Sequence, residues 1–289
     1  MADRVTGPSP HAHRFRIAIA ALVGIAIGAI AVALVVIASN GSSTDTATKW
    51  SDWSPPDDGV LGAREIANHV APFYRISSVD QLDVVTVVNL SSASPSSASA
   101  SGSSSSNATS NSSLQVAVRS DPSSSQVSLL GGKTIAYNLC GIGSSNCTIG
   151  AGKPSPDRLL LLRREALELA LYTFKYISGI QNVVAILPPG HTVQGCTGIC
   201  PNPHVRSAVK PVDIALLFVR DELKPWLTQP LSYTFPERFP PSVPELSLWK
   251  QTPEAGLVAQ ITERGLFSEQ LVQTQDGSNL IVLDPQPPQ

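Results

Sequence analysis

The longest run of apolar residues in the chain extends from Ile17 to Ala38 and contains no charged side chain. A helix rises about 1.5 Å per residue, so about 20 residues cross the hydrocarbon core of a membrane. This run has 22 residues. Backbone groups in lipid must bond within their own segment, which only a helix allows in a single span. The pattern therefore predicts one transmembrane helix.

Charges around this segment predict its orientation. Arg4, Arg14 and Arg16 precede it, whereas the first basic residue after it is Lys49. Because basic residues collect on the cytoplasmic side, we expect residues 1–16 to form a cytoplasmic tail. The pattern leaves open whether the segment stays as an anchor or is cleaved as a signal sequence, although it is longer than the usual apolar core of a signal.

The remaining chain is expected outside, as a polar stalk over 39–58 and an extracytoplasmic domain over 59–289. In that domain, apolar residues recur at helical spacing. The segments concerned are Val60–Val70, Asp157–Ile177, a short one around Leu223–Thr228, and Pro253–Arg264.

Runs rich in β-branched residues predict strands between these helices. They are Gln81–Leu90, Leu114–Arg119, Gln126–Leu130, Lys133–Leu139, Asn182–Leu187 and Asp213–Val219. Phe267–Thr274 and Asn279–Leu283 flank an Asp-Gly pair, which is typical of a hairpin turn. Strands interleaved with helices predict an α/β or α+β domain with a mixed sheet and two to three helices.

Residues 91–113 interrupt the domain with a different composition. Fourteen of these 23 residues are serine, and none is charged or aromatic. Such a segment buries too little apolar area to offset the entropy that it loses on ordering. We therefore predict a disordered loop between two strands, because the free energy of closing a loop rises only slowly with its length.

Charge excludes one class of partner. The 20 Lys and Arg residues are balanced by 22 Asp and Glu, which gives a formal net charge of −2. The chain therefore lacks the broad basic surface that nucleic-acid binding requires. The expected partners are the membrane, through residues 17–38, and a protein of the cell envelope.

All four cysteines follow the membrane segment, where disulfides are the usual state of cysteine. Their two clusters suggest the local pairs Cys140–Cys147 and Cys196–Cys200. A bond between the clusters stays open as an alternative, because four cysteines allow three connectivities.

The second cysteine cluster also permits a metal site. His191, Cys196, Cys200 and His204 are all residue types that bind zinc or copper. A redox role for Cys196 and Cys200 is a further alternative. Dithiol motifs have the form C-x-x-C, whereas three residues separate this pair, and an oxidising compartment favours the disulfide.

Catalytic motifs are absent from the sequence: it has no G-x-S-x-G, no H-E-x-x-H and no phosphate-binding loop. The catalytic residues are therefore unknown, and no cofactor is predicted. If the chain were a hydrolase, its general base would come from the histidines that follow the membrane segment, which are His69, His191 and His204.

The predicted helix 157–177 carries charged residues as well as an apolar stripe. We expect Glu165 and Glu168 to be solvated charges on its surface. Arg164 is placed to pair with Glu168, because residues four apart are neighbours on a helix.

Several short motifs resemble single-pass, membrane-anchored envelope proteins of actinobacterial type. They are Trp50 and Trp53 before Pro55, Ile66-Ala67 with Val70, Tyr74-Arg75, Val183–Pro189 and Gly265-Leu266-Phe267. The resemblance covers most of the exterior part and implies a location in the envelope. It implies no activity, and no functional residue is carried over.

Together these features predict a membrane-anchored, extracytoplasmic protein whose domain is a non-catalytic binding or envelope-interaction module. The alternatives are a membrane-tethered extracytoplasmic enzyme of hydrolase type and a metal or redox protein that uses Cys196 and Cys200. A cleft that gathers a histidine, a carboxylate and a serine would favour the enzyme.

The orientation of the chain can be tested with fusions. We expect alkaline phosphatase fused after Gln289 to be active, because the enzyme folds only outside the cytoplasm, and the same fusion after Arg16 to be inactive. An inactive fusion at Gln289, with the protein present in the membrane fraction, would refute the predicted topology.

Overall fold

The computed structural model describes residues 49–88, 90, 114–120, 126–143, 147–150, 155–189, 213–237, 239–274 and 279–285. The predicted transmembrane helix, the Ser-rich tract and the second cysteine cluster lie outside these ranges. Within them, no helix is both long and apolar enough to cross a membrane.

Among the described residues, eight strands form one mixed sheet in the order β1-β4-β5-β6-β7-β8-β2-β3. The strands are β1 (Asp83–Val88), β2 (Leu114–Arg119), β3 (Val127–Leu129), β4 (Thr134–Gly141), β5 (Asn182–Ile186), β6 (Ile214–Val219), β7 (Leu266–Gln273) and β8 (Asn279–Pro285). Strand β4 is parallel to β5, and β2 to β8, whereas the other neighbours are antiparallel. Each predicted strand is present, and so is the hairpin of β7 and β8.

The described residues contain six α-helices, so the prediction of two to three helices was too low. They are α2 (Gly59–Val70), α3 (Pro156–Tyr176), α4 (Arg220–Leu227), α5 (Leu231–Thr234), α6 (Leu246–Trp249) and α7 (Pro253–Glu263), with 3-10 turns at Ala71–Phe73 and Val243–Glu245. Most of the additional helices are short and lie in the Pro-rich region. Proline there stands just before or within the first turn of α5, of the Val243–Glu245 turn and of α7. Its fixed φ suits a helix start.

The two long helices begin where the sequence supplies a cap. The side chain of Asp58 accepts a hydrogen bond from the backbone N–H of Gly59 at the start of α2. At the start of α3, Ser155 accepts one from the N–H of Arg158 at 3.1 Å, and Pro156 is the first helical residue. Both caps satisfy N–H groups that have no partner within the helix.

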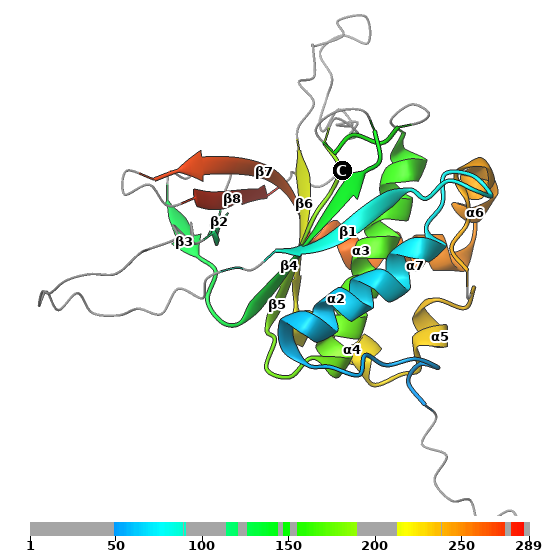
Figure 1. The fold of residues 1–289 in the computed structure, drawn as a ribbon, viewed down its shortest axis with the longest axis horizontal. Helices are drawn as coiled ribbons and strands as arrows, with labels where there is room; N and C mark the ends of the chain where they lie inside the picture. The colour runs from blue at the N-terminus through cyan, green and yellow to red at the C-terminus, as the bar shows by residue number, and fades with distance from the viewer. Residues whose placement is uncertain are drawn as a thin grey trace, which may run out of the picture. The chain divides into compact units, whose positions relative to one another are not determined.

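The helices cover one face of the sheet, with α3 along the centre (Figure 1). Strands β4, β5 and β6 are buried on both faces, because alternate side chains enter two different cores. In β4, for example, Ile135 and Tyr137 pack under the helices, whereas Ala136 packs on the opposite face. The fold is therefore an α+β domain whose main core lies between α3 and the sheet.

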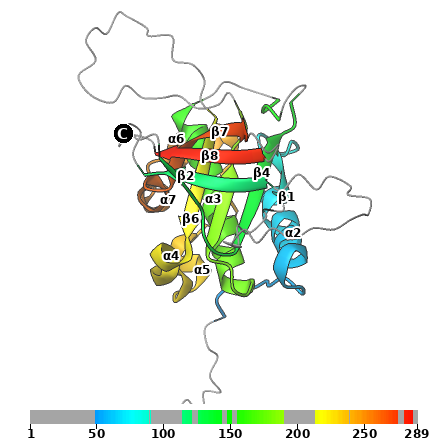
Figure 2. The ribbon, with the colours of Figure 1, turned by 90° about the vertical axis from the view of Figure 1, so that its left-hand side faces the viewer.

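The second core exists because the sheet bends over itself. Figure 2 shows β8 and β2 crossing in front of the central strands. Val116 of β2, Leu283 of β8 and Val184 of β5 belong to one buried cluster on the face away from the helices. A parallel bridge between Leu90, just after β1, and Leu114 of β2 brings the two ends of the sheet together.

The folded unit begins at Trp50, within the segment expected to be a stalk. The ring centroid of Trp50 lies 5.4 Å from Tyr172 and 5.6 Å from Tyr176 of α3, edge-on in both cases. Its carbonyl accepts a 2.7 Å hydrogen bond from the N–H of Leu231. Trp50 therefore packs on the domain.

Two helical glycines provide a test of this packing. A Cβ at Gly62 of α2 would overlap the carbonyl oxygen of Asp57 and lie 2.6 Å from Cδ1 of Ile177. We expect Gly62→Ala to destabilise the domain by about 1–3 kcal/mol, because the close-packed backbone has to move. The loss should appear as a lower Tm in thermal unfolding.

Gly256 of α7 is the matched control, because a Cβ there would meet nothing within 4 Å. Gly256→Ala should stabilise the domain by about 0.5–1 kcal/mol through helix propensity. Equal effects of the two substitutions would contradict the packing of α2 against the chain around Asp57 and Ile177.

Candidate functional site

Helix α3 carries charged residues on faces that are buried. Arg164 and Glu165 are 1% and 0% exposed, and the side chain of Glu168 is 15% exposed. The prediction that Glu165 and Glu168 are solvated was wrong. The sheet covers one side of the helix while α2, α6 and α7 pack against others, so little of its surface meets water. The predicted pair of Arg164 with Glu168 is confirmed at 3.2 Å.

Arg164 is the centre of a buried polar network. Its Nε lies 2.6 Å from Oε1 of Glu254 on α7, and its Nη1 donates to the hydroxyl of Tyr74 at 2.7 Å. That hydroxyl donates in turn to Oε2 of Glu168 at 2.7 Å. Every member thus has a partner, which a buried charge requires.

The same guanidinium holds the segment between α5 and α6. Its Nη2 donates to the carbonyl of Glu237 at 3.1 Å, and its Cζ lies 4.5 Å from the ring centroid of Phe235. The backbone N–H of Glu237 donates to the second carboxylate oxygen of Glu254 at 3.3 Å. Arg164 therefore joins three parts of the helical layer, which identifies a structural role for this network.

A second buried group is a pair of carboxyls. Asp83, the first residue of β1, and Glu165 of α3 are both 0% exposed, and the charge of Asp83 acts on the carboxyl of Glu165. Within the described residues, none of their four carboxyl oxygens has a hydrogen-bond partner. Two neighbouring carboxylates in a buried site without hydrogen-bond donors repel each other, so the pair does not ionise completely at neutral pH.

The environment of the pair explains this. Burial raises the pKa of Asp83 to about 7. Burial also raises the pKa of Glu165 well above its ordinary value, and the nearby charge of Asp83 adds to the effect. Because both side chains are enclosed, the pair is placed to hold a proton rather than to contact a substrate.

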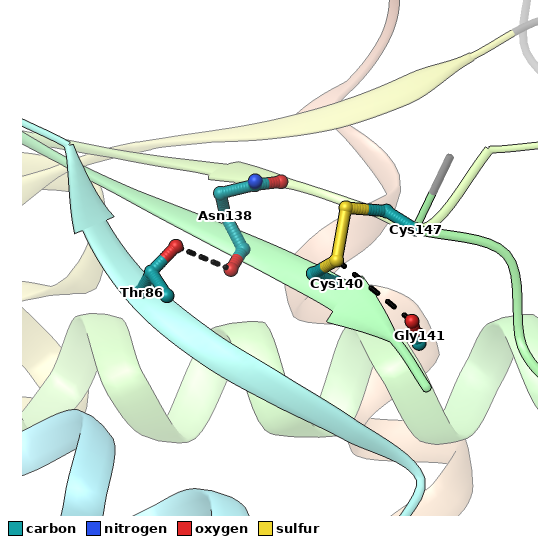
Figure 3. The surroundings of a disulfide bond; sticks show 5 residues. All are labelled: Thr86, Asn138, Cys140, Gly141 and Cys147. Carbon is teal, nitrogen blue, oxygen red and sulfur yellow. Dashed lines mark hydrogen bonds between the residues drawn. A yellow bond between two sulfur atoms is a disulfide. The ribbon is translucent and has the colours of Figure 1, made fainter. Parts of the chain in front are cut away.

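The predicted disulfide between Cys140 and Cys147 is present, with an S–S distance of 2.07 Å (Figure 3). It closes the turn that follows β4, and the N–H of Gly141 donates to the carbonyl of Cys147 at 2.9 Å. On the adjacent strand, the Thr86 hydroxyl donates to the carbonyl of Asn138 at 3.5 Å. The bond therefore fixes the turn at the carboxyl end of β4.

Aromatic rings gather where α2 ends. The rings of Trp53 and His69 are stacked, with centroids 3.9 Å apart and planes inclined by 8°. Phe73 follows His69 by four residues. Its ring centroid lies 5.8 Å from that of His69 and 5.6 Å from that of Phe239. Phe73 is 37% and Phe239 62% exposed. We call Trp53, His69, Phe73 and Phe239 the aromatic face.

The structure separates the candidate residues of the sequence into two groups. His69 belongs to the aromatic face. His191, Cys196, Cys200 and His204 lie outside the described residues, so the second disulfide, the metal site and the redox pair stay predictions. In the described part of the chain, no three His, Cys, Asp or Glu side chains are grouped to hold a metal ion.

Comparison with protein-family models, with curated proteins and with solved structures finds no match to this chain. The resemblance to actinobacterial envelope proteins therefore stays an expectation.

Sequence reasoning missed the carboxyl pair, although a signal was present. Glu165 lies between Leu162 and Leu169 on the apolar stripe of α3, so the periodicity placed it on the buried face. Asp83 is followed by an alternating strand in which Val85 is buried, and residues two apart share a face. Glu165 was nevertheless predicted to be solvated, and no prediction was made for Asp83.

The carboxyl pair predicts how stability depends on pH. An acid whose pKa is raised on folding contributes most below its unfolded value, near 4, and this contribution is lost as pH rises through the folded value. For Asp83 the folded pKa is about 7, so we expect stability to fall between pH 4 and pH 8, by an amount on the order of several kcal/mol. Thermal unfolding across this range measures it.

Asp83→Asn removes one titrating group while keeping the size of the side chain. We expect the variant to show a smaller fall in Tm between pH 5 and pH 8 than the unaltered chain. Glu222→Gln, at an exposed position on α4, is the control and should keep the full fall. A pH dependence unchanged by Asp83→Asn would show that the buried pair does not cause it.

Proposed function

We propose that this chain is a membrane-anchored extracytoplasmic protein whose domain binds another protein of the cell envelope and performs no catalysis. The observation that carries the proposal is the aromatic face, in which Phe73 and Phe239 are exposed side by side. Exposed aromatic side chains that lie together are enriched at binding surfaces, because they bury a large area with little loss of conformational entropy.

The exposed rings of the aromatic face are held in place by buried or partly buried aromatic neighbours, as a binding surface requires. The stacked Trp53 and His69 lie next to Phe73, and Tyr172 of α3 packs edge-on against both, at 5.7 Å and 5.8 Å. Rings held in one orientation lose less entropy on binding than mobile ones. The aromatic face is therefore organised before a partner arrives.

The proposed location rests on two features. The 22-residue apolar segment from Ile17 to Ala38 suits a membrane anchor, and the arginines before it favour an exterior domain. The disulfide between Cys140 and Cys147 supports the same side, because such bonds persist mainly outside the cytoplasm. An envelope protein is then the class of partner within reach.

The proposal can be tested by site-specific crosslinking of the full chain in its own membranes. A photoreactive phenylalanine analogue at position 239 should form an adduct of one discrete mass with a second envelope protein. Phe73→Ala should lower the yield of that adduct by about tenfold or more, since truncating an anchor residue weakens binding by about 2 kcal/mol.

Leu129 on β3 is the matched control position. It is 51% exposed and apolar, and β3 is the last strand in the order of the sheet, away from the helices in Figure 1. The same analogue at position 129 should give no such adduct. Equal adducts at both positions, or none at position 239, would contradict binding through the aromatic face.

A further inference from the structure

Arg158 is a buried cation for which the described structure provides no counter-charge. The residue is 3% exposed, and its Nε and Nη1 have no hydrogen-bond partner. Burial lowers the pKa of its guanidinium, and no neighbouring carboxylate acts in the other direction. A buried polar group without a partner is rare in folded proteins and strongly destabilising when it is charged.

The position of Arg158 makes its charge still less favourable. It lies in the first turn of α3, a helix of 21 residues, and a helix N-terminus carries a partial positive charge. Arg158 is the third residue of this helix, and side chains of a helix lean toward its N-terminus. Two positive charges thus meet at one place, and an anion bound there would stabilise both.

The acidic residue of the same turn is already engaged elsewhere. Asp157 forms an ion pair with Lys250, with 3.1 Å between its Oδ2 and the Nζ. Successive helical residues point in different directions, so this carboxylate is turned to Lys250 at the surface. The first turn of α3 therefore supplies no carboxylate that neutralises Arg158.

The chain that leads into and away from this end supplies no carboxylate either. Strand β4, helix α3 and strand β5 follow one another, and β4 and β5 are parallel, so α3 begins at the carboxyl ends of both strands. The described residues that follow those ends, 141–143, 147–150, 155–156 and 186–189, contain no Asp or Glu. Ligands of parallel strands bind at this edge, beside the helix N-terminus.

We propose that Arg158 and the N-terminus of α3 form a binding site for an oxyanion of phosphate type. A guanidinium presents two N–H groups to two oxygens of such an anion, and the helix dipole adds to the attraction. The anion is either free in solution or part of a lipid headgroup, since both present the same oxygens. The site is separate from the aromatic face and does not depend on the proposed partner.

Thermal unfolding of the full chain in a neutral detergent tests the site. Sodium phosphate and sodium acetate are compared with sodium chloride at the same ionic strength. We expect phosphate at about 100 times its Kd to raise the Tm by about 5 °C above the chloride value. The Tm is also measured in nanodiscs of neutral lipid, with and without phosphatidylglycerol. This comparison distinguishes binding of a lipid headgroup from binding of free phosphate.

Arg158→Met removes the charge and keeps much of the side-chain volume. We expect this variant to be more stable than the unaltered chain without phosphate, because an unpaired buried charge is gone, and to give no phosphate response. Arg158→Lys keeps the charge without the planar fork, and should need about tenfold more phosphate for the same rise in Tm. The lysine variant keeps the test valid if the methionine variant does not fold.

Arg64→Met, at an exposed position on α2, is the control and should respond to phosphate as the unaltered chain does. A rise in Tm that disappears in Arg158→Met supports the site. A rise with sodium phosphate identifies free phosphate as the ligand, whereas a rise with phosphatidylglycerol alone identifies a lipid headgroup. A rise that Arg158→Met retains, or the absence of any rise beyond that of chloride in both media, would overturn the proposal.

Discussion

The ion pair of Arg164 with Glu254, 2.6 Å long and almost fully buried, joins the parts of the helical layer. Through one guanidinium, α3 is connected to α7, to Tyr74 before β1 and to the backbone at Glu237. Removing one partner of such a pair leaves an uncompensated buried charge, which typically costs 3–5 kcal/mol. The Pro-rich segment between α5 and α6 therefore owes its position to charge as much as to apolar packing.

Three charged residues of helix α3 are buried, and each is stabilised in a different way. Arg164 is neutralised by ion pairs with Glu254 and Glu168. Burial and the neighbouring Asp83 raise the pKa of Glu165 well above its ordinary value, so this carboxyl is neutral at neutral pH, at the expense of stability at higher pH. Arg158 has no partner in the described residues, and the proposed oxyanion would complete the series. The same enclosure produces all three, because a helix covered on so many sides has little surface left for solvated charge.

The two surfaces proposed to bind lie on different parts of the domain. The aromatic face is built at the end of α2 and beside α3, where rigid rings are exposed together. The oxyanion site lies where β4 and β5 end, next to the turn that the Cys140–Cys147 disulfide closes. Each surface is therefore attached to α3, the most buried element, so both have a rigid support.

Local patterns were enough to predict the elements of this fold. Alternation and β-branching identified each strand of the sheet, helical spacing identified α2, α3, α4 and α7, and the spacing of Cys140 and Cys147 suggested their bond. These features depend on residues close in sequence, which is why they can be found without a structure. The short helices of the Pro-rich region were undercounted, because helices of four residues have too little periodicity to detect.

By itself, then, the sequence determined the order of elements, the mixed sheet, the local disulfide and the predicted membrane segment. Only the tertiary structure decided which charges are buried, since that depends on what packs against the far sides of α3. Asp83 and Glu165 are 82 positions apart in the chain, and only the tertiary packing brings Asp83 close enough to raise the pKa of Glu165. The burial of a charge is a property of its neighbours in space, which periodicity along one helix does not record.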